Sequence, residues 1–290
     1  WLIKNEGQYR NNLVFAANYD FQLRNSNFFP ISLLNYAIKP GENQLDFTVD
    51  PYLRVNNCKI VYDAAGKKIT ATFKQEIADK KLPGAVVMVA RKGKLVYAQN
   101  FGGLNNAAGA PMQTDSIFRL YSMTKPLVST ALMMLVEDGK VQLTDPVSKF
   151  LPSFKSPMVS TPTFDPVFNG VTFKLLPANR EPTIQDLLRH TSGITYGELT
   201  KNTLVREAYI KAGVFKPDLD YDARELKGSD MADGIGKAPL AQQPGTAWEY
   251  SLSVDVQGRV VEAVSGQRLN DFMAQRIFKP LKMADTGFHV

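Results

Sequence analysis

The chain has 290 residues, enough for one large domain or two modest ones. Its composition, 44% hydrophobic and 21% charged, excludes a disordered or fibrous protein. The net charge of +6 is spread along the chain without basic blocks, so no nucleic-acid partner is expected. No apolar run approaches the length of a membrane span, and the lone Cys58 excludes an intrachain disulfide.

Several common functional sites have no support in the sequence. His190 and His289 are too few for a typical zinc site, and neither lies in a His-Glu-x-x-His pattern. A P-loop, a complete Gly-x-Gly-x-x-Gly loop and the Gly-x-Ser-x-Gly elbow of the α/β-hydrolases are missing as well. We therefore expect neither a metal nor a cofactor.

The first 66 residues read as a β-rich extension or small module. Residues 13–23, 45–49 and 53–62 are rich in apolar and aromatic side chains, which partly alternate, and a Pro-Gly turn precedes the second of these segments. We find no chemical motif in this part. The main domain is expected to cover residues 67–290.

The hydrophobic period then changes. Apolar residues recur every fourth position over residues 69–77, which predicts an amphipathic helix. Residues 84–90 and 95–99 are two apolar runs joined by a short segment that contains Gly93. This pattern predicts a β-hairpin.

Helix signals are strongest in the second half of the chain. Residues 123–138 carry an apolar stripe, and Thr183 with Asp186 resembles a capping box at the start of a short helix. Two further helices are expected over residues 251–264 and from 269 to about 278.

Two long stretches, residues 153–181 and 201–245, have weak periodicity, and the first contains four prolines. Loops of this length inside a compact domain are typical of lids or binding-site walls, with disorder as the alternative. We expect irregular structure in both.

A Ser-x-x-Lys motif, Ser122 and Lys125, stands where the helix over residues 123–138 begins. A spacing of three residues puts both side chains on one helical face. A neighbouring amine can take the proton that a serine hydroxyl must lose to act as a nucleophile, and free N–H groups at a helix start favour negative charge on a substrate oxygen. The motif alone is weak, because a serine cap followed by a solvated lysine has the same spacing.

Tyr250 ends a loop directly before the helix expected over residues 251–264. A tyrosine in this place can relay a proton between Ser122 and a leaving group. The alternative is an aromatic anchor that packs the loop onto the core.

Taken together, these segments resemble the penicillin-recognising serine hydrolases, which comprise the class C β-lactamases, the DD-peptidases and the family VIII carboxylesterases. The resemblance runs from about residue 70 to the end of the chain. Six segments match in the order in which the family has them: residues 82–87, 118–126, 143–152, 183–193, 244–253 and 277–281. Six ordered matches are far more specific than any single motif.

The resemblance implies an α/β (α+β) fold of the β-lactamase/transpeptidase type, with an antiparallel sheet flanked by helices, a helical subdomain and here an N-terminal β-rich extension. It implies that Ser122 is the acylated nucleophile, that Lys125 activates it and that Tyr250 is the general acid/base. It also assigns His190 to a structural loop rather than to proton transfer.

We expect the sequence neighbours of this trio, Tyr121, Trp248 and Leu252, to contact the substrate. The β-lactamases carry Tyr-x-Asn, whose amide helps to hold the substrate, whereas Leu252 stands in the third position here. This difference favours the esterase branch, which Trp248 also fits. The family's Lys-Thr-Gly or His-x-Gly triad does not follow Tyr250, so we expect it beyond Val290, in a longer protein.

The leading expectation is hydrolysis of small esters or amides through an acyl-enzyme. The alternatives are a β-lactamase or D-Ala-D-Ala carboxypeptidase, acyl transfer to an acceptor other than water, and a catalytically incomplete binding or regulatory member. The expected partner is a small-molecule ester, amide or lactam, and the oligomeric state is open. No signal peptide is visible and the chain begins at Trp1, so periplasmic, secreted and cytoplasmic locations all fit.

Overall fold

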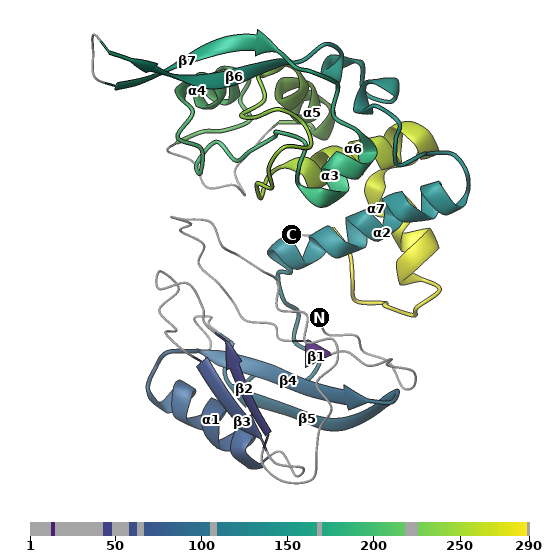
Figure 1. Cartoon of the computed structure of the whole chain (residues 1–290). Helices are drawn as coiled ribbons and strands as arrows, with labels where there is room; N and C mark the ends of the chain where they lie inside the picture. The colour runs from purple at the N-terminus through teal and green to yellow at the C-terminus, as the bar shows by residue number, and fades with distance from the viewer. Residues whose placement is uncertain are drawn as a thin grey trace. The chain divides into compact units, whose positions relative to one another are not determined.

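The computed structural model describes residues 13–14, 43–47, 58–62, 67–104, 109–166, 170–217 and 226–288. The chain divides into two compact units. The first comprises residues 1–123 with 282–285, and the second residues 124–281 with 286–290. Figure 1 labels the strands and helices of both.

The first unit contains the predicted β-hairpin, which is confirmed. β4 (Gly84–Arg91) pairs antiparallel with β5 (Lys94–Gly102), and β1 (Leu13–Val14) lies on the other edge of β4. Between β4 and β5 the chain turns through Lys92 and Gly93, whose φ angles are 48° and 74°. Positive φ at both central residues gives the turn twist that suits a two-residue hairpin.

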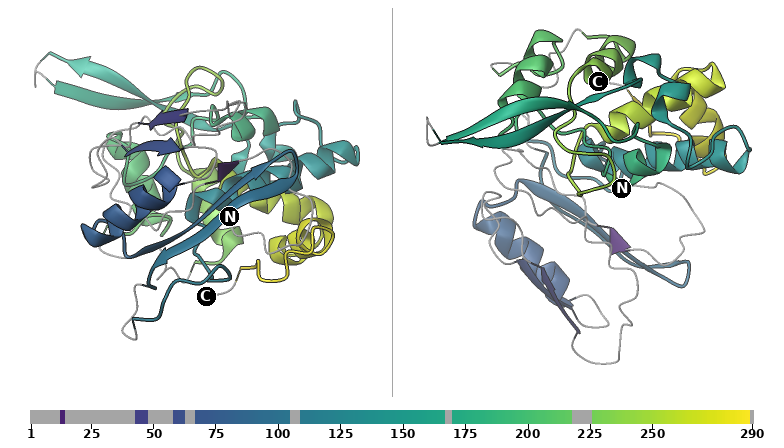
Figure 2. Two further views of the ribbon diagram at one scale, coloured as in Figure 1. Left: turned by 90° about the horizontal axis from the view of Figure 1, so that it is seen from below. Right: turned by 45° about the horizontal axis from the view of Figure 1, so that its top comes forward.

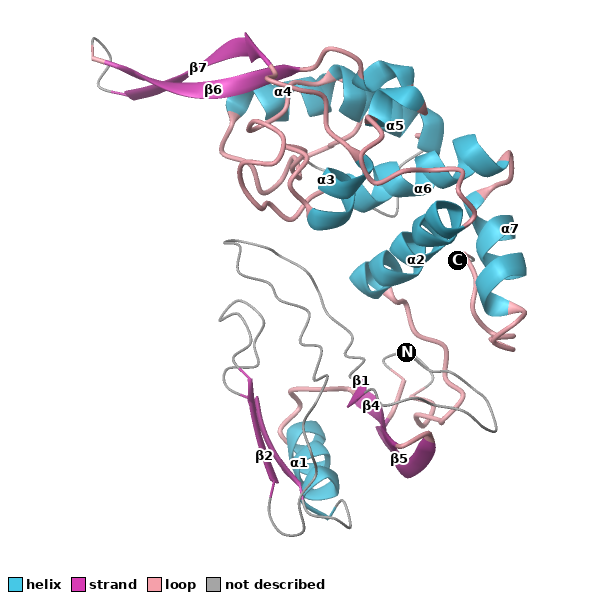
Figure 3. Ribbon diagram, turned by 45° about the vertical axis from the view of Figure 1, so that its right-hand side comes forward, coloured by secondary structure: helices cyan, strands magenta, loops and turns pink. Residues whose placement is uncertain are grey.

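Helix α1 (Lys67–Ala78) packs on this hairpin, as its apolar period predicts. The rings of Phe73 and Phe101 stack with their centres 5.4 Å apart. α1 also contacts β3 (Cys58–Tyr62), which pairs antiparallel with β2 (Asn43–Phe47) (Figure 3). These strands agree with two of the three β segments expected in the N-terminal region.

The other parts of the predicted N-terminal strands, residues 15–23, 48–49 and 53–57, lie outside the described residues. The boundary at residue 66 between an extension and a main domain therefore stays a prediction.

In the second unit, helices pack around α2 (Thr124–Glu137), whose apolar stripe is buried. α6 (Ser253–Ser265) and α7 (Leu269–Met273) contact α2, and α7 continues into a π-helical turn, Ala274–Phe278. α3 (Ile184–Arg189) packs in turn on α6. The four helices predicted in this half of the chain are confirmed, with ends within about two residues.

A fully buried glutamine, Gln257 of α6, joins three of these helices. Its Oε1 accepts a hydrogen bond from Ser129 Oγ of α2 at 2.8 Å, and its Nε2 donates to the Leu187 carbonyl of α3 at 3.0 Å. A buried amide is stable only when its polar atoms are paired. The side chain thereby fixes the mutual placement of the helices that carry Lys125 and His190.

The irregular structure predicted for residues 153–181 is wrong. β6 (Met158–Asp165) and β7 (Gly170–Pro177) form a continuous antiparallel hairpin, and Figure 2 shows it projecting as a twisted ribbon beyond the helices of its unit. The four prolines obscured it, because proline cannot donate to a strand ladder. The first residues of β6 bond to the backbone of Leu240, but beyond Ser160 each strand of the ribbon has a free edge, where a proline is tolerated.

The second weakly periodic stretch, residues 201–245, also contains regular structure. It holds α4 (Thr203–Lys211) and α5 (Gly228–Lys237), so the prediction of irregular structure fails for these parts. α5 escaped notice because glycine lowers helix propensity. Close packing explains two of its glycines, since a Cβ atom at Gly234 or Gly236 would collide with neighbouring side chains.

Candidate active site

The candidate nucleophile, Ser122, lies in a 3-10 turn, Tyr121–Met123, directly before α2. Tyr121 has a φ of 45°, which is uncommon for a residue with a side chain, and 50% of the residue's surface is exposed. Backbone strain of this kind gathers at functional sites. This turn belongs to the first unit, and the approach of Ser122 to the groups described below stays a prediction.

The structure brings together Lys125 and Tyr250, two of the three predicted catalytic residues. Lys125 lies in the first turn of α2, and its Nζ is 4.8 Å from the centre of the Tyr250 ring. The same nitrogen is 6.0 Å from the centre of the Tyr196 ring. These distances are typical of cation–π interactions. Lys125 is therefore held half-buried among aromatic rings rather than extended into solvent.

Tyr250 belongs to an aromatic cluster formed with His190, Tyr196 and Trp248. Its ring centre is 5.2 Å from that of His190, 5.6 Å from that of Tyr196 and 6.5 Å from that of Trp248. Trp248 keeps 49% of its surface exposed. The cluster thus combines the Lys125 ammonium, several ring faces and the half-exposed apolar surface of Trp248.

His190 follows α3 in the left-handed conformation, with φ 56° and ψ 37°. Its Nδ1 accepts a hydrogen bond from the Ser251 backbone N–H at 3.2 Å. Burial lowers the pKa of His190 from its ordinary value of 6.5 to about 4, and the charge of Lys125 acts in the same direction. The imidazole is therefore neutral near pH 7, which fits the structural role that the resemblance implies.

The loop that leads to Tyr250, residues 244–250, is called the tyrosine loop below, and its backbone bonds to the segment after α3. The Gly245 N–H donates to the Thr191 carbonyl at 2.7 Å, and the Glu249 N–H donates to the His190 carbonyl at 2.9 Å. Each bond joins segments more than fifty residues apart in the chain. Together they hold the tyrosine loop against the end of α3.

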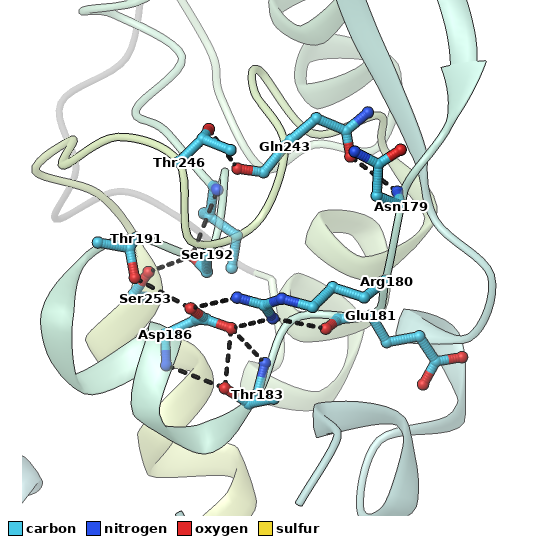
Figure 4. Close-up of polar contacts among 11 residues, drawn as sticks. Asn179, Arg180, Glu181, Thr183, Asp186, Thr191, Ser192, Gln243, Thr246 and Ser253 are labelled. Atoms are coloured by element: carbon cyan, nitrogen blue, oxygen red, sulfur yellow. Dashed lines mark hydrogen bonds and ion pairs between the residues drawn. The ribbon is translucent and has the colours of Figure 1, made fainter. Parts of the chain in front are cut away.

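Asp186 organises this region, as Figure 4 shows. Its carboxylate accepts two hydrogen bonds from the Arg180 guanidinium, at 2.5 and 3.0 Å, and one from the Thr191 hydroxyl at 3.0 Å. It also accepts from the backbone N–H and the hydroxyl of Thr183, both at 2.8 Å, which confirms the capping box predicted from the sequence. Burial alone would raise the pKa of Asp186, but these hydrogen bonds outweigh it and hold the pKa below its usual range.

Gly245 shows how closely the tyrosine loop approaches this ion pair. Its φ is 84°, and a Cβ atom there would run into Nη2 of Arg180. Glycine is the residue that meets both the backbone conformation and the space.

Glu249 and Tyr196 are two residues of this region that sequence reasoning missed. The Glu249 carboxylate accepts hydrogen bonds from the Thr195 hydroxyl and from Gln242 Nε2, and burial raises the pKa of Glu249. The signal for Glu249 was its place next to Tyr250 in the sequence. Tyr196 follows the His-Thr-Ser-Gly segment closely, but nothing in the sequence placed it beside Lys125.

Leu252, predicted to contact the substrate, occupies the N-cap position of α6 and is only 3% exposed. Its side chain packs in the core of the second unit. The predicted contacts of Leu252, Trp248 and Tyr121 with a substrate stay predictions.

Among the residues that the structure describes, no three His, Cys, Asp or Glu side chains are placed so that they could hold a metal ion. None of the described helices combines the length and the apolar character needed to cross a membrane.

The fold and this site define the class of protein. Residues 69–290 match the family model described as Beta-lactamase, and the chain belongs to this family. The resemblance recognised in the sequence and the β-lactamase/transpeptidase-like fold are thereby confirmed.

Individual relatives carry the names of esterases and of acyltransferases. Esterase EstB of Burkholderia gladioli is 35% identical over 224 residues, which are 76% of this chain and 51% of that protein. The structure of EstCE1, a hydrolase with promiscuous acyltransferase activity, matches with a TM-score of 0.60 at 28% identity, over 76% of this chain and 52% of that chain. Simvastatin Synthase (LovD) from Aspergillus terreus matches with a TM-score of 0.58 at 26% identity, over 74% and 50%. This chain thus spans about half the length of the relatives it matches.

Proposed function

We propose that the protein hydrolyses small esters through an acyl-enzyme on Ser122. The observation that carries the proposal is the placement of the Lys125 ammonium 4.8 Å from the centre of the Tyr250 ring, three residues after Ser122 in the chain. Membership of the Beta-lactamase family and the similarity to Esterase EstB support it.

The proposed reaction has two steps. Ser122 Oγ attacks the ester carbonyl carbon while Tyr250, beside the cation of Lys125, takes the hydroxyl proton. Tyr250 returns that proton to the alcohol oxygen as the ester C–O bond breaks, which leaves the acyl group on Ser122. Water then attacks the acyl-enzyme, the carboxylic acid departs and Ser122 regains its proton.

Two features favour esters over lactams. Leu252 stands where the β-lactamases of the family carry an asparagine, and its buried apolar side chain offers no amide to a lactam. Trp248, half-exposed and within the aromatic cluster, offers an apolar surface for an acyl or alkyl group.

Burst kinetics with a p-nitrophenyl ester test the proposal on the full-length protein. We expect a stoichiometric burst and an acyl group on the peptide that contains Ser122. Ser122→Ala should lower turnover by about a thousandfold or more, since the nucleophile is lost. Ser229→Ala, at an exposed serine of α5, is the matched control and should keep full activity. Turnover by Ser122→Ala equal to that of the wild-type protein, or acylation at another residue, would contradict the proposal.

Acyl transfer is the second candidate, because EstCE1, which this chain resembles, is a hydrolase with promiscuous acyltransferase activity. The same ester assayed with added butanol distinguishes the two, since transfer yields a new ester and hydrolysis yields the free acid. A β-lactamase or peptidase would instead be labelled stoichiometrically by a fluorescent penicillin. A binding or regulatory member would leave a fluorophosphonate probe unreacted.

A further inference from the structure

A chain of buried hydroxyl groups leads from His190 into the second unit. Ser251 Oγ lies 3.1 Å from Nδ1 of His190 and 2.7 Å from Ser253 Oγ. Ser253 Oγ lies in turn 2.8 Å from Ser192 Oγ. All three serines are fully buried, so their hydroxyl groups bond to one another and to His190 instead of to bulk water.

A backbone donor fixes the tautomer of His190. The Ser251 N–H can only donate, so Nδ1 of His190 must be the unprotonated, accepting nitrogen of the ring. The Ser251 hydroxyl oxygen lies 3.1 Å from the same nitrogen and accepts from the Ser253 N–H at 3.3 Å. The proton of the neutral ring is therefore on Nε2.

His190 holds the residues on both sides of Tyr250. Its carbonyl oxygen accepts the Glu249 N–H at 2.9 Å, and its Nδ1 accepts the Ser251 N–H at 3.2 Å. Its ring lies against the ring of Tyr250 itself, with the centres 5.2 Å apart. One residue therefore brackets the backbone of the tyrosine and supports its side chain.

We propose that His190 is a positioning residue for Tyr250, which it holds in place for proton transfer to the leaving group. This inference rests on the proposed function, because it assigns His190 a part in the same reaction. The bracket needs a neutral ring, since a proton on Nδ1 would turn the acceptor of the Ser251 N–H into a donor.

Substitutions at His190 can separate the hydrogen bond from the bulk of the side chain. His190→Asn places an amide oxygen where Nδ1 stands and tolerates the left-handed backbone conformation. His190→Leu has a similar branching and offers no acceptor. The pair thus differs chiefly in the hydrogen bond to Ser251.

Two esters of the same acid provide a readout that simple damage to the fold would not change. A p-nitrophenolate ion leaves without a proton, whereas the alkoxide of an ethyl ester needs one from the general acid. We expect His190→Leu to lower kcat/KM for both esters, because Tyr250 also takes the Ser122 proton, and to lower it about tenfold more for the ethyl ester, which alone needs the proton returned to its leaving group. A smaller folded fraction would lower both values equally, so their ratio isolates the position of Tyr250. His190→Asn should keep the wild-type ratio.

Tyr250→Phe tests whether His190 acts through the tyrosine. If it does, the double variant His190→Leu/Tyr250→Phe should lose no more activity on the ethyl ester than Tyr250→Phe alone. Equal losses on the two esters, or additive losses in the double variant, would overturn the positioning role while leaving the proposed function standing. A wild-type protein that forms no acyl-enzyme on Ser122 would overturn the proposed function and this inference with it.

A measurement on the unmodified protein covers the case in which His190→Leu does not fold. ¹⁵N-histidine NMR of the wild-type protein, with His190→Asn as the assignment variant, identifies the His190 signals as those that the variant lacks. We expect the neutral form with its proton on Nε2 and an accepting Nδ1. A proton on Nδ1 at pH 7 would overturn the inference.

Discussion

The tyrosine loop and the β6–β7 ribbon are two proline-containing parts of the same unit, and they are built on opposite principles. The loop is held by buried polar groups, with backbone bonds to His190 and Thr191 and the Arg180–Asp186 pair beneath Gly245. Beyond its base, where Met158 and Ser160 bond to the backbone of Leu240, the ribbon is held by its own ladder. It leaves apolar side chains in solvent there, with Phe164 and Val171 more than 60% exposed. Convergent buried donors and acceptors, rather than hydrophobic period, mark the part of this unit in which we propose that the chemistry takes place.

Asp186→Asn should break the support of the tyrosine loop and have the largest effect on stability of the substitutions that act on this loop. The amide cannot accept all the hydrogen bonds that the carboxylate accepts, and the Thr183 N–H and the Thr191 hydroxyl compete for what remains. Arg180 is half-exposed and can turn to water, so we expect the loss of unfolding free energy to be about 3 kcal/mol, at the lower end for a buried pair. Urea denaturation at pH 7 measures it.

A matched control for this substitution is Asp233→Asn in α5. Asp233 lies 3.8 Å from Lys237, and both side chains are exposed, so its loss should cost less than about 0.5 kcal/mol. Because the pKa of Asp186 is depressed, its contribution is present above the usual carboxyl range and disappears as the pH falls through the lowered pKa. The difference between wild type and Asp186→Asn should therefore shrink at strongly acidic pH, and a difference that persisted there would contradict the ion-pair explanation.

Protonation of His190 should destabilise the protein at a higher pH than protonation of Asp186 does. Below 6.5 the unfolded chain protonates this histidine, whereas the folded protein does so only below about 4. The unfolded state then binds more protons, and stability falls as the pH drops from 7 to 4.5, by about 2 kcal/mol. The charged and titratable groups around the ring are Lys125, Tyr250 and, through its backbone, Glu249.

His190→Asn isolates this effect, because asparagine does not titrate and the other groups are common to both proteins. The difference in unfolding free energy between wild type and His190→Asn should change by about 2 kcal/mol between pH 7 and pH 4.5, to the disadvantage of the wild type. Parallel stability curves across this range would mean that the ring is protonated as readily in the folded protein as in the unfolded chain.

The sequence was sufficient to predict those elements that depend on residues close together in the chain. The apolar stripe of α2, the Lys92-Gly93 turn and the Thr183–Asp186 capping box each depend on residues within a few positions of one another. These features follow from period and turn chemistry alone. Ser122, Lys125 and Tyr250 stand at the starts of such elements, but their predicted catalytic roles come from the resemblance to the serine hydrolases and stay predictions.

Hydrogen bonds between residues far apart in the chain could not be predicted from the sequence. The bond from Ser251 to His190 joins residues 61 positions apart, and Gln257 reaches Ser129 across 128 positions. No local pattern encodes which buried donor meets which acceptor, since that depends on how the helices pack. The ribbon was missed for a different reason, because prolines that would disrupt a central strand are harmless at a free edge.

The ribbon should respond least to substitution, and Phe164→Ala tests this. Phe164 faces Val171 in the register of the hairpin, and 61% of its surface is in solvent, so its loss should change the unfolding free energy by about 0.5 kcal/mol. The same substitution at Phe154, which is fully buried beside α5, should cost about 4 kcal/mol. Denaturation of the two variants side by side in the full-length protein measures the contrast. If the loss of unfolding free energy at Phe164 approached the loss at Phe154, the apolar face of the ribbon would have to be covered in the folded protein. The ribbon would then not differ from the tyrosine loop in being held without buried contacts.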